Sequence, residues 1–201
     1  RPELRGRTPY GAPQLDVDVQ LNTNESSYPV PDEVVRAAVA ALHEGLSGLN
    51  RYPDREFTAL RKALGDYLAQ QSGVTFRPEQ LWAGNGSNEV LQHLVQAFGG
   101  PGRIALGFTP AYSMHPIIAA GTRTEWLPAP RRSDFSLDVR EAASVLREHA
   151  PDLTFLTSPN NPTGQSIDPD ELAVLVDAAP GMVVVDEAYA EFSDRPSTIS
   201  L

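Results

Sequence analysis

Apolar and polar residues follow two patterns along most of the chain, one with the spacing of helices and one with short continuous apolar runs. The segments 31–46 and 54–70 place apolar residues on a single helical face, which predicts two surface helices with one buried stripe each. Further along, short apolar runs alternate with more helical patterns. We expect strands at 80–85, 103–108, 122–128, 152–158 and 182–186, and helices at 88–98, 112–120, 138–149 and 168–178.

The alternation of strands with helices indicates the fold class. It favours right-handed βαβ crossovers and an open, mostly parallel sheet, so we expect an α/β fold. A chain of 201 residues, 41% of them hydrophobic, is long enough for one large domain with a well-buried core. Residues 1–30 are rich in proline and glycine and show little periodicity, so we interpret them as an extended arm that lies on a neighbouring chain. Residues 31–201 then form the domain that contains the sheet.

The last expected strand ends in a carboxylate. Val183, Val184 and Val185 form the continuous apolar run of a strand that is buried on both faces, and Asp186 follows directly. A buried carboxylate is normally paired, hydrogen-bonded or neutralised, because an isolated buried charge is costly. The sequence therefore predicts a cation or a set of donors at this strand end.

Other expected strand ends also carry polar turns, and ligands of parallel sheets gather at such ends. GNGSNE, at 84–89, feeds a helix with Ser87 at the expected N-cap, so free N–H groups and the helix dipole converge on an anion-sized point. An ordinary capped turn has the same pattern. SPNNPTG, at 158–164, contains the usual turn-forming residues, and Tyr112 alone is typical of a packed aromatic. The site interpretation therefore depends on these segments acting together.

Composition excludes several classes of function. The net charge of -10, from 16 basic and 26 acidic residues, disfavours nucleic-acid binding. The absence of cysteine excludes disulfides and thiolate chemistry. No apolar run reaches membrane-spanning length and no signal peptide is visible, so we expect a cytoplasmic protein. The four histidines are scattered over expected helices, so we interpret them as surface or packing residues and propose no metal site; they are His43, His93, His115 and His149.

Four segments, GNGSNE, TPAYSMH, SPNNPTG and VVDEAY, resemble in this order the strand ends of the fold-type I pyridoxal-phosphate aminotransferases. The resemblance covers nearly the whole chain. LNTNESSYPVP and RYPD are similar to segments of the histidinol-phosphate aminotransferases, which exchange an amino group between glutamate and imidazole-acetol phosphate, with histidinol phosphate and 2-oxoglutarate on the other side of the reaction, in histidine biosynthesis. The resemblance implies the large domain of that fold, three αβα layers around a mostly parallel sheet, with pyridoxal 5′-phosphate as cofactor.

The resemblance also implies roles for single residues. Asp186 would hold the protonated pyridine nitrogen of the cofactor, so that the ring can accept electrons from the substrate. Tyr189 and Asn161 would contact the phenolic oxygen, and Tyr112 would stack on the ring face. We expect the Asn161–Pro162 bond to be cis, as it commonly is in similar proteins. Glu187 is interpreted as structural.

Further residues are implied at the phosphate and at the substrate. The backbone N–H groups of Ser87 and Asn88 would bind the cofactor phosphate, with the Ser87 hydroxyl as another donor. Tyr52 would reach the same phosphate across the interface of a homodimer. Tyr28 and Asn24 of the arm would face the substrate, again from the neighbouring subunit.

One part of the family pattern has no match. The catalytic lysine of similar proteins lies in a Ser-Lys motif beyond DEAY, whereas Lys62 is the single lysine here and lies on the polar side of an expected helix. We therefore expect residues 31–201 to be the first part of the large domain and this chain alone to be inactive. Threonine-phosphate decarboxylases and some aromatic aminotransferases remain alternatives, and a non-enzymatic phosphate-binding module is a third.

Overall fold

The structure is a computed structural model that describes residues 5, 6, 11 and 13–201. The chain divides into two compact units, Arg1–Thr58 and Ala59–Leu201. In the first unit, α1 spans Asp32–Gly45 and a short 3-10 helix, η2, spans Leu46–Gly48. Acidic residues in the first turn of α1, Asp32 and Glu33, match the positive end of the helix dipole. Residues 13–31 contain no helix or strand.

The second unit contains a four-stranded sheet, and every strand pair in it is parallel. The strands are β1 Ile104–Thr109, β2 Glu125–Pro130, β3 Leu153–Thr157 and β4 Met182–Asp186, in the spatial order β2-β1-β3-β4. The main helices are α2 Thr58–Ser72, α3 Ser87–Phe98, α4 Met114–Gly121, α5 Val139–His149 and α6 Pro169–Ala178. Short 3-10 helices are η3 Pro78–Gln80, η4 Ala190–Phe192 and η5 Thr198–Ser200. The expected α/β class is confirmed.

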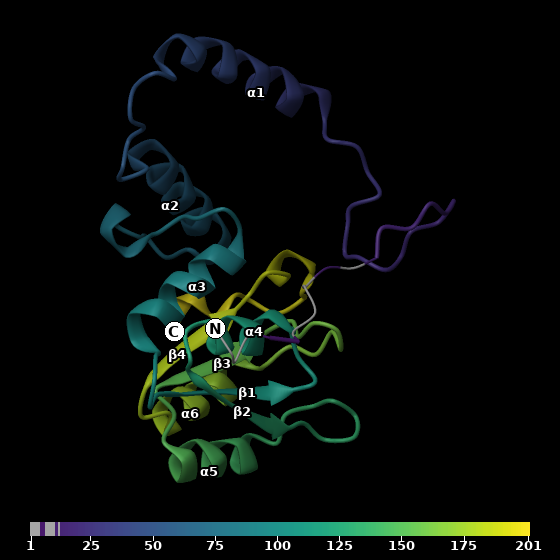
Figure 1. Cartoon of the computed structure of the whole chain (residues 1–201), viewed down its shortest axis with the longest axis vertical. Helices are drawn as coiled ribbons and strands as arrows, with labels where there is room; N and C mark the ends of the chain where they lie inside the picture. The colour runs from purple at the N-terminus through teal and green to yellow at the C-terminus, as the bar shows by residue number, and fades with distance from the viewer. Residues whose placement is uncertain (1–4, 7–10, 12) are drawn as a thin grey trace. The chain divides into compact units, whose positions relative to one another are not determined.

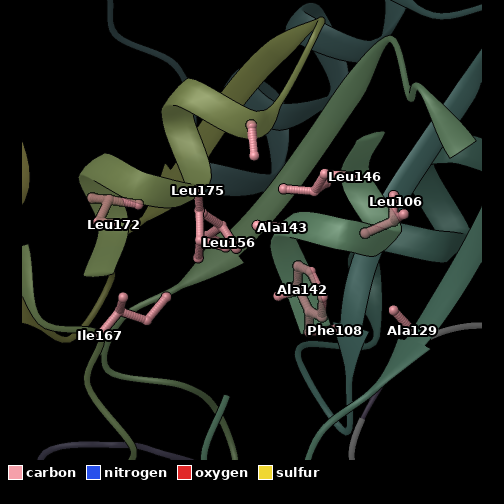
Figure 2. Close-up of a cluster of buried hydrophobic side chains, with 11 residues drawn as sticks. Leu106, Phe108, Ala129, Ala142, Ala143, Leu146, Leu156, Ile167, Leu172 and Leu175 are labelled. Atoms are coloured by element: carbon pink, nitrogen blue, oxygen red, sulfur yellow. The ribbon is translucent and has the colours of Figure 1, made fainter. Parts of the chain in front are cut away.

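Two apolar cores lie on opposite faces of the sheet and create three layers (Figure 1). Because side chains alternate across a strand, Leu106 and Phe108 of β1 enter one core and Ala105 enters the other. The first core lies between the sheet and the helices α5 and α6; Figure 2 shows its side chains, which include Leu146, Leu156, Leu172 and Leu175. The second core joins α3 and α4 to the other face through Leu91, Val95, Ile118, Ala119, Leu153 and Phe155.

Helices α5 and α6 begin where local sequence supplies N-terminal caps. The carboxylate of Asp138 accepts hydrogen bonds from the backbone N–H groups of Arg140 and Glu141 at the start of α5. Asp168 caps α6 in the same way and forms a capping box with Glu171. The two caps fix where α5 and α6 begin, and so they fix the direction in which the chain enters each helix.

Two sequence-based expectations about elements are wrong. Residues 80–85 form no strand, although Leu81 has extended backbone dihedrals, because no described strand pairs with them. The apolar stripe expected to be buried on the first helix is exposed instead, since α1 has no buried residue and Val34, Val39 and Leu42 are all exposed. Strand β4 agrees with its prediction: it is half-buried, with Val183 and Val185 packed against one core and Val184 against the other.

The strand order places one reversal in the middle of the sheet. The chain passes from β1 outward to β2 and then returns to the other side of β1 to form β3. In open parallel sheets the crevice at such a reversal, beyond the carboxyl ends of the strands, is the usual ligand site. The turns after β1 and β3 are therefore where the structure favours a functional site.

Among the described residues, no helix is both long and apolar enough to cross a membrane.

Gly107 is required by the packing of Trp126 against β1. An added Cβ at position 107 would lie 2.4 Å from Cη2 of Trp126, which is far inside van der Waals contact. We expect Gly107→Ala to lower the free energy of unfolding by about 1–3 kcal/mol, as overpacking does in other cores. Gly121→Ala is the control, because a Cβ there meets no atom within 4 Å. Urea unfolding of both variants measures this difference, and equal stabilities would contradict it.

Candidate active site

Asn160 links the turns at the two central strand ends. Its side-chain amide donates to the carbonyl of Pro110 at 3.0 Å, in the turn after β1, and to Oγ1 of Thr163 at 2.7 Å. The residue is only 2% exposed, and its backbone N–H also donates to the carbonyl of Gln165 at 2.8 Å. A single buried side chain therefore ties the segment before Tyr112 to the turn that contains Asn161.

The carboxylate of Asp186 is buried at the end of β4 and is satisfied by two donors. Its Oδ2 lies 3.1 Å from Nε2 of His115, and the two side chains are 7% and 1% exposed. An ionised carboxylate only accepts, so we assign the proton of this hydrogen bond to His115. The backbone N–H of Ala188 donates to Oδ1 at 3.2 Å. Each carboxylate oxygen retains capacity to accept another hydrogen bond from a ligand.

An aromatic cluster fixes the orientation of His115. Its ring stacks on Phe155 of β3 with centroids 4.8 Å apart, and the edge of Tyr112 meets it at 5.5 Å. Trp126 of β2 lies 6.4 Å from His115 and 5.9 Å from Phe155. The imidazole is thus enclosed on several sides, and its Nε2 lies toward Asp186.

The amino end of α3 presents backbone N–H groups. Gly86 is the N-cap residue, with φ of 81°, and it has no side chain to cap the helix. The expectation that Ser87 occupies the N-cap is therefore wrong by one residue; Ser87 is the first helical residue and Asn88 the second. Only glycine adopts this φ readily, so the sharp entry into α3 depends on Gly86. The N–H groups of the first helical residues have no partner within a helix, which leaves them for an anion.

A hydrogen bond connects the two halves of the site. The hydroxyl of Tyr112 donates to Oδ1 of Asn88 at 3.2 Å, which joins the start of α3 to the turn before α4. Tyr112 in turn contacts His115, and His115 contacts Asp186. The expected anion site and the buried carboxylate are therefore connected through one continuous series of contacts, with a half-buried tyrosine ring between them.

The remaining expected residues of this unit lie in the turns around Asp186. Asn161 is half-buried in the turn after β3, and its bond to Pro162 is cis, as expected. Tyr189 is half-buried and precedes η4. Glu187 accepts hydrogen bonds from the hydroxyl and N–H groups of Thr198 at 2.9 and 2.8 Å, which agrees with a structural role.

Three expected residues belong to the other unit. Tyr52, Tyr28 and Asn24 lie within Arg1–Thr58, and the side chains of Tyr52 and Tyr28 are largely exposed there. Their assignment to a cofactor or a substrate stays a prediction.

His115 was not predicted as a site residue. We interpreted all four histidines as surface or packing residues; His43, His93 and His149 are exposed, but His115 is a partner of Asp186. Its position three residues after Tyr112 was the available signal, because residues with this spacing in a helical turn share a face. Asn160 was also missed, since the neighbouring Asn161 carried the whole interpretation of that turn.

Comparison with solved structures establishes the class of fold. An aminotransferase from Mycobacterium tuberculosis superimposes with a TM-score of 0.73 at 25% identity, covering 89% of this chain and 47% of that one. A histidinol-phosphate aminotransferase from Sinorhizobium meliloti, solved in complex with pyridoxal-5′-phosphate, superimposes with a TM-score of 0.66 at 22% identity. This match covers 80% of this chain and 42% of that one. The three-layer fold is therefore that of aminotransferases.

The sequence assigns the chain to a family. Residues 16–200 match the model of aminotransferase class I and II, and the chain belongs to this family. Histidinol-phosphate aminotransferases from Rhodococcus jostii and Mycobacterium avium are 57% and 56% identical to it over all 201 residues. These matches cover 53% and 50% of the two relatives, so the chain spans about half the length of the curated relatives it matches.

The buried pair of His115 and Asp186 should contribute measurably to stability. A double-mutant cycle with His115→Phe and Asp186→Ala in the ligand-free protein should give a coupling free energy of about 1.5–3 kcal/mol, because a buried hydrogen bond to a charged group is lost. Urea unfolding of the four proteins measures it. The ion pair of Lys62 and Asp66, at 2.7 Å but exposed, is the matched control and should couple far more weakly. Equal coupling in the two pairs would contradict the assignment.

Proposed function

We propose that the protein containing this chain transfers an amino group between glutamate and imidazole-acetol phosphate, with pyridoxal 5′-phosphate as cofactor. The identity of 57% to a histidinol-phosphate aminotransferase over the whole chain carries the proposal. The contacts that join Asn88, Tyr112, His115 and Asp186 support it, because they bring an anion site, an aromatic face and a buried carboxylate together.

The donor set fits the cofactor at its pyridine nitrogen. The side chain of Asp186 meets a donor at each oxygen, His115 on one side and the N–H of Ala188 on the other. Such a carboxylate binds a protonated pyridine nitrogen and keeps the proton there. When bound, the cofactor supplies a ring that takes up electron density from the substrate bond being broken. Asp186 maintains the charge state in which the ring does so, and His115 holds Asp186 in position.

The other groups of the site fit the phosphate and the ring. The N–H groups of Ser87 and Asn88 would bind the phosphate at the positive end of α3. The ring of Tyr112 offers a face for stacking on the cofactor. Its hydroxyl donates to Asn88, and this hydrogen bond helps to hold the ring in place. We assign Asn161 and Tyr189 to the phenolic oxygen of the cofactor, where a hydrogen bond tunes the basicity of the neighbouring groups.

Lys62 does not fit the role of the catalytic lysine. Its side chain is exposed on α2, and the hydrogen bond to Asp66 raises the pKa of its ammonium group. A protonated amine is no nucleophile. We infer that residues 1–201 by themselves bind the cofactor reversibly at most and do not turn over substrate.

We further propose a cytoplasmic homodimer with shared active sites. Residues 13–31 contain no helix or strand, and the apolar residues Val34, Val39 and Leu42 of α1 are exposed. A partner subunit would bury such a surface. In this arrangement Tyr52 serves the phosphate of the opposite site, and Tyr28 and Asn24 face its substrate.

The function is tested on the whole protein with purified substrates. We expect glutamate-dependent amination of imidazole-acetol phosphate to exceed both amination of aromatic 2-oxo acids and decarboxylation of threonine phosphate. A higher kcat/KM for either alternative would replace the proposed substrate, while no reaction with any of them would reject the proposed enzyme.

Asp186→Asn tests the role of the carboxylate in that reaction. The amide has the same size but no charge, so it should lower kcat/KM at least about a hundredfold, the range seen when a fixed electrostatic group is removed. Asp177→Asn, on the exposed side of α6, is the control and should retain full activity. An Asp186→Asn variant within a few-fold of the wild-type rate would contradict the assignment.

Mixed dimers test whether the sites are shared. Variants Tyr52→Ala and Asp186→Asn should each have low activity, and a mixture that exchanges subunits should recover some, because one site of each mixed dimer then carries both native residues. The activity of the mixture relative to each parent measures this. If subunit exchange is demonstrated and no activity returns, Tyr52 and Asp186 act in the same subunit.

A further inference from the structure

Glu89 forms a hydrogen-bonded ring with the turn that precedes α3. Its Oε2 accepts a hydrogen bond from the side-chain amide of Asn85 at 2.9 Å, and another from the backbone N–H of the same residue. The N–H of Gly86 donates to the carbonyl of Gly84 at 2.9 Å, and the N–H of Glu89 donates to the carbonyl of Gly86 at 3.2 Å. The turn is therefore closed on itself by backbone and side-chain bonds.

This arrangement differs from an ordinary capping box. In a capping box the third helical residue reaches back to the N–H of the N-cap residue, here Gly86. In this turn Gly84 already accepts from that N–H, and the Glu89 carboxylate binds one residue earlier, at Asn85. The carboxylate thereby lies over the turn, and both of its donors come from Asn85. The N–H groups of Ser87 and Asn88 are left for another acceptor.

The charge of Glu89 makes this arrangement informative. The N–H of Asn85 is the main cause that lowers the pKa of the Glu89 carboxyl, so the group is ionised at neutral pH. A carboxylate close to a phosphate site repels the phosphate. If Glu89 acted on the phosphate through its charge alone, it would weaken binding. A favourable effect of Glu89 must therefore come from the geometry that it gives to the turn.

The turn is packed closely against the same side chain. A Cβ at Gly84 would lie 3.0 Å from Oε2 of Glu89 and 3.3 Å from Cγ2 of Val90. Gly84 thus allows the backbone to approach the carboxylate. With Gly86 at φ of 81°, the conformation of the turn is defined at both glycines and at Asn85 between them.

We propose that Glu89 is a positioning residue for the cofactor phosphate, an inference that rests on the proposed function. Held by Asn85, its carboxylate fixes the turn at Gly86, and the turn directs the N–H groups of Ser87 and Asn88 at the phosphate. Asn85 has a second role, because its two donors keep the negative charge of Glu89 off those N–H groups.

The experiment compares two ligands that differ only in the phosphate ester. Equilibrium dissociation constants for pyridoxal 5′-phosphate and for pyridoxal are measured on the whole protein by absorbance. Glu89→Ala should raise the dissociation constant of pyridoxal 5′-phosphate about tenfold, the effect of losing one or two well-formed hydrogen bonds. The dissociation constant of pyridoxal should stay within about twofold of the wild-type value. Glu89→Gln keeps an acceptor oxygen for Asn85 and should stay within about threefold for both ligands. Glu148→Ala, an exposed acid in α5, is the control and should change neither.

Other results overturn the proposal. Tighter binding of pyridoxal 5′-phosphate by Glu89→Ala would show that charge repulsion outweighs positioning. Equal weakening of both ligands would show a general loss of structure. If Glu89→Ala does not fold, Asn85→Ala replaces it and should weaken pyridoxal 5′-phosphate alone; an unchanged constant rejects the inference. A wild-type protein that binds neither ligand rejects the proposed function and, with it, this inference.

Discussion

The buried carboxylate of Asp186 constrains the arrangement of the surrounding elements. A charge at the end of β4 needs donors that do not move, because an unsatisfied buried carboxylate would cost more than a typical hydrogen bond returns. His115 meets this need from α4, which lies between β1 and β2 in the sequence, and the N–H of Ala188 meets it locally. The pair therefore fixes α4 relative to the end of β4.

The orientation of His115 depends in turn on aromatic residues of two strands, β2 and β3. Phe155 stacks on its ring, and Trp126 lies beside both rings, where it packs over Gly107, the one position of β1 without a side chain to obstruct it. A glycine in the middle of a buried strand weakens the strand. Gly107 therefore lowers the stability of β1 itself. In return it makes room for Trp126, which helps to hold the His115 ring in its hydrogen bond to Asp186.

The sequence predicts the parts of the structure that depend on neighbouring residues better than those that depend on residues far apart in the chain. The helices and the strands β1 to β4 follow from local periodicity, and the ends of α5 and α6 follow from the caps Asp138 and Asp168. Residues 80–85 have the composition of a strand, but a strand exists only with a paired neighbour, which composition does not specify. The family motifs predicted Asp186 and Tyr112 as site residues, and the structure joins the two through His115.

Residues that act through other residues were harder to predict. The pairing of His115 with Asp186 joins positions 71 residues apart, and only the strand order β2-β1-β3-β4 brings them together. Asn160 likewise binds Pro110 across 50 residues. Glu89 appeared in the sequence only as the last residue of GNGSNE, because its bonds to Asn85 depend on the conformation of the turn at Gly86.

The acidity of the chain is compatible with an anion site because its local carboxylates are all engaged. The net charge of -10 gives no general attraction for a phosphate. Near the site, Asp186 accepts from His115, Glu187 from Thr198 and Glu89 from Asn85, so each negative charge is bound to donors of its own. The N–H groups at the start of α3 then act over a short distance, where the directed dipoles of the helix end matter more than the distant net charge. The proposed binding of an anion would thus depend on which donors the neighbouring carboxylates leave unused.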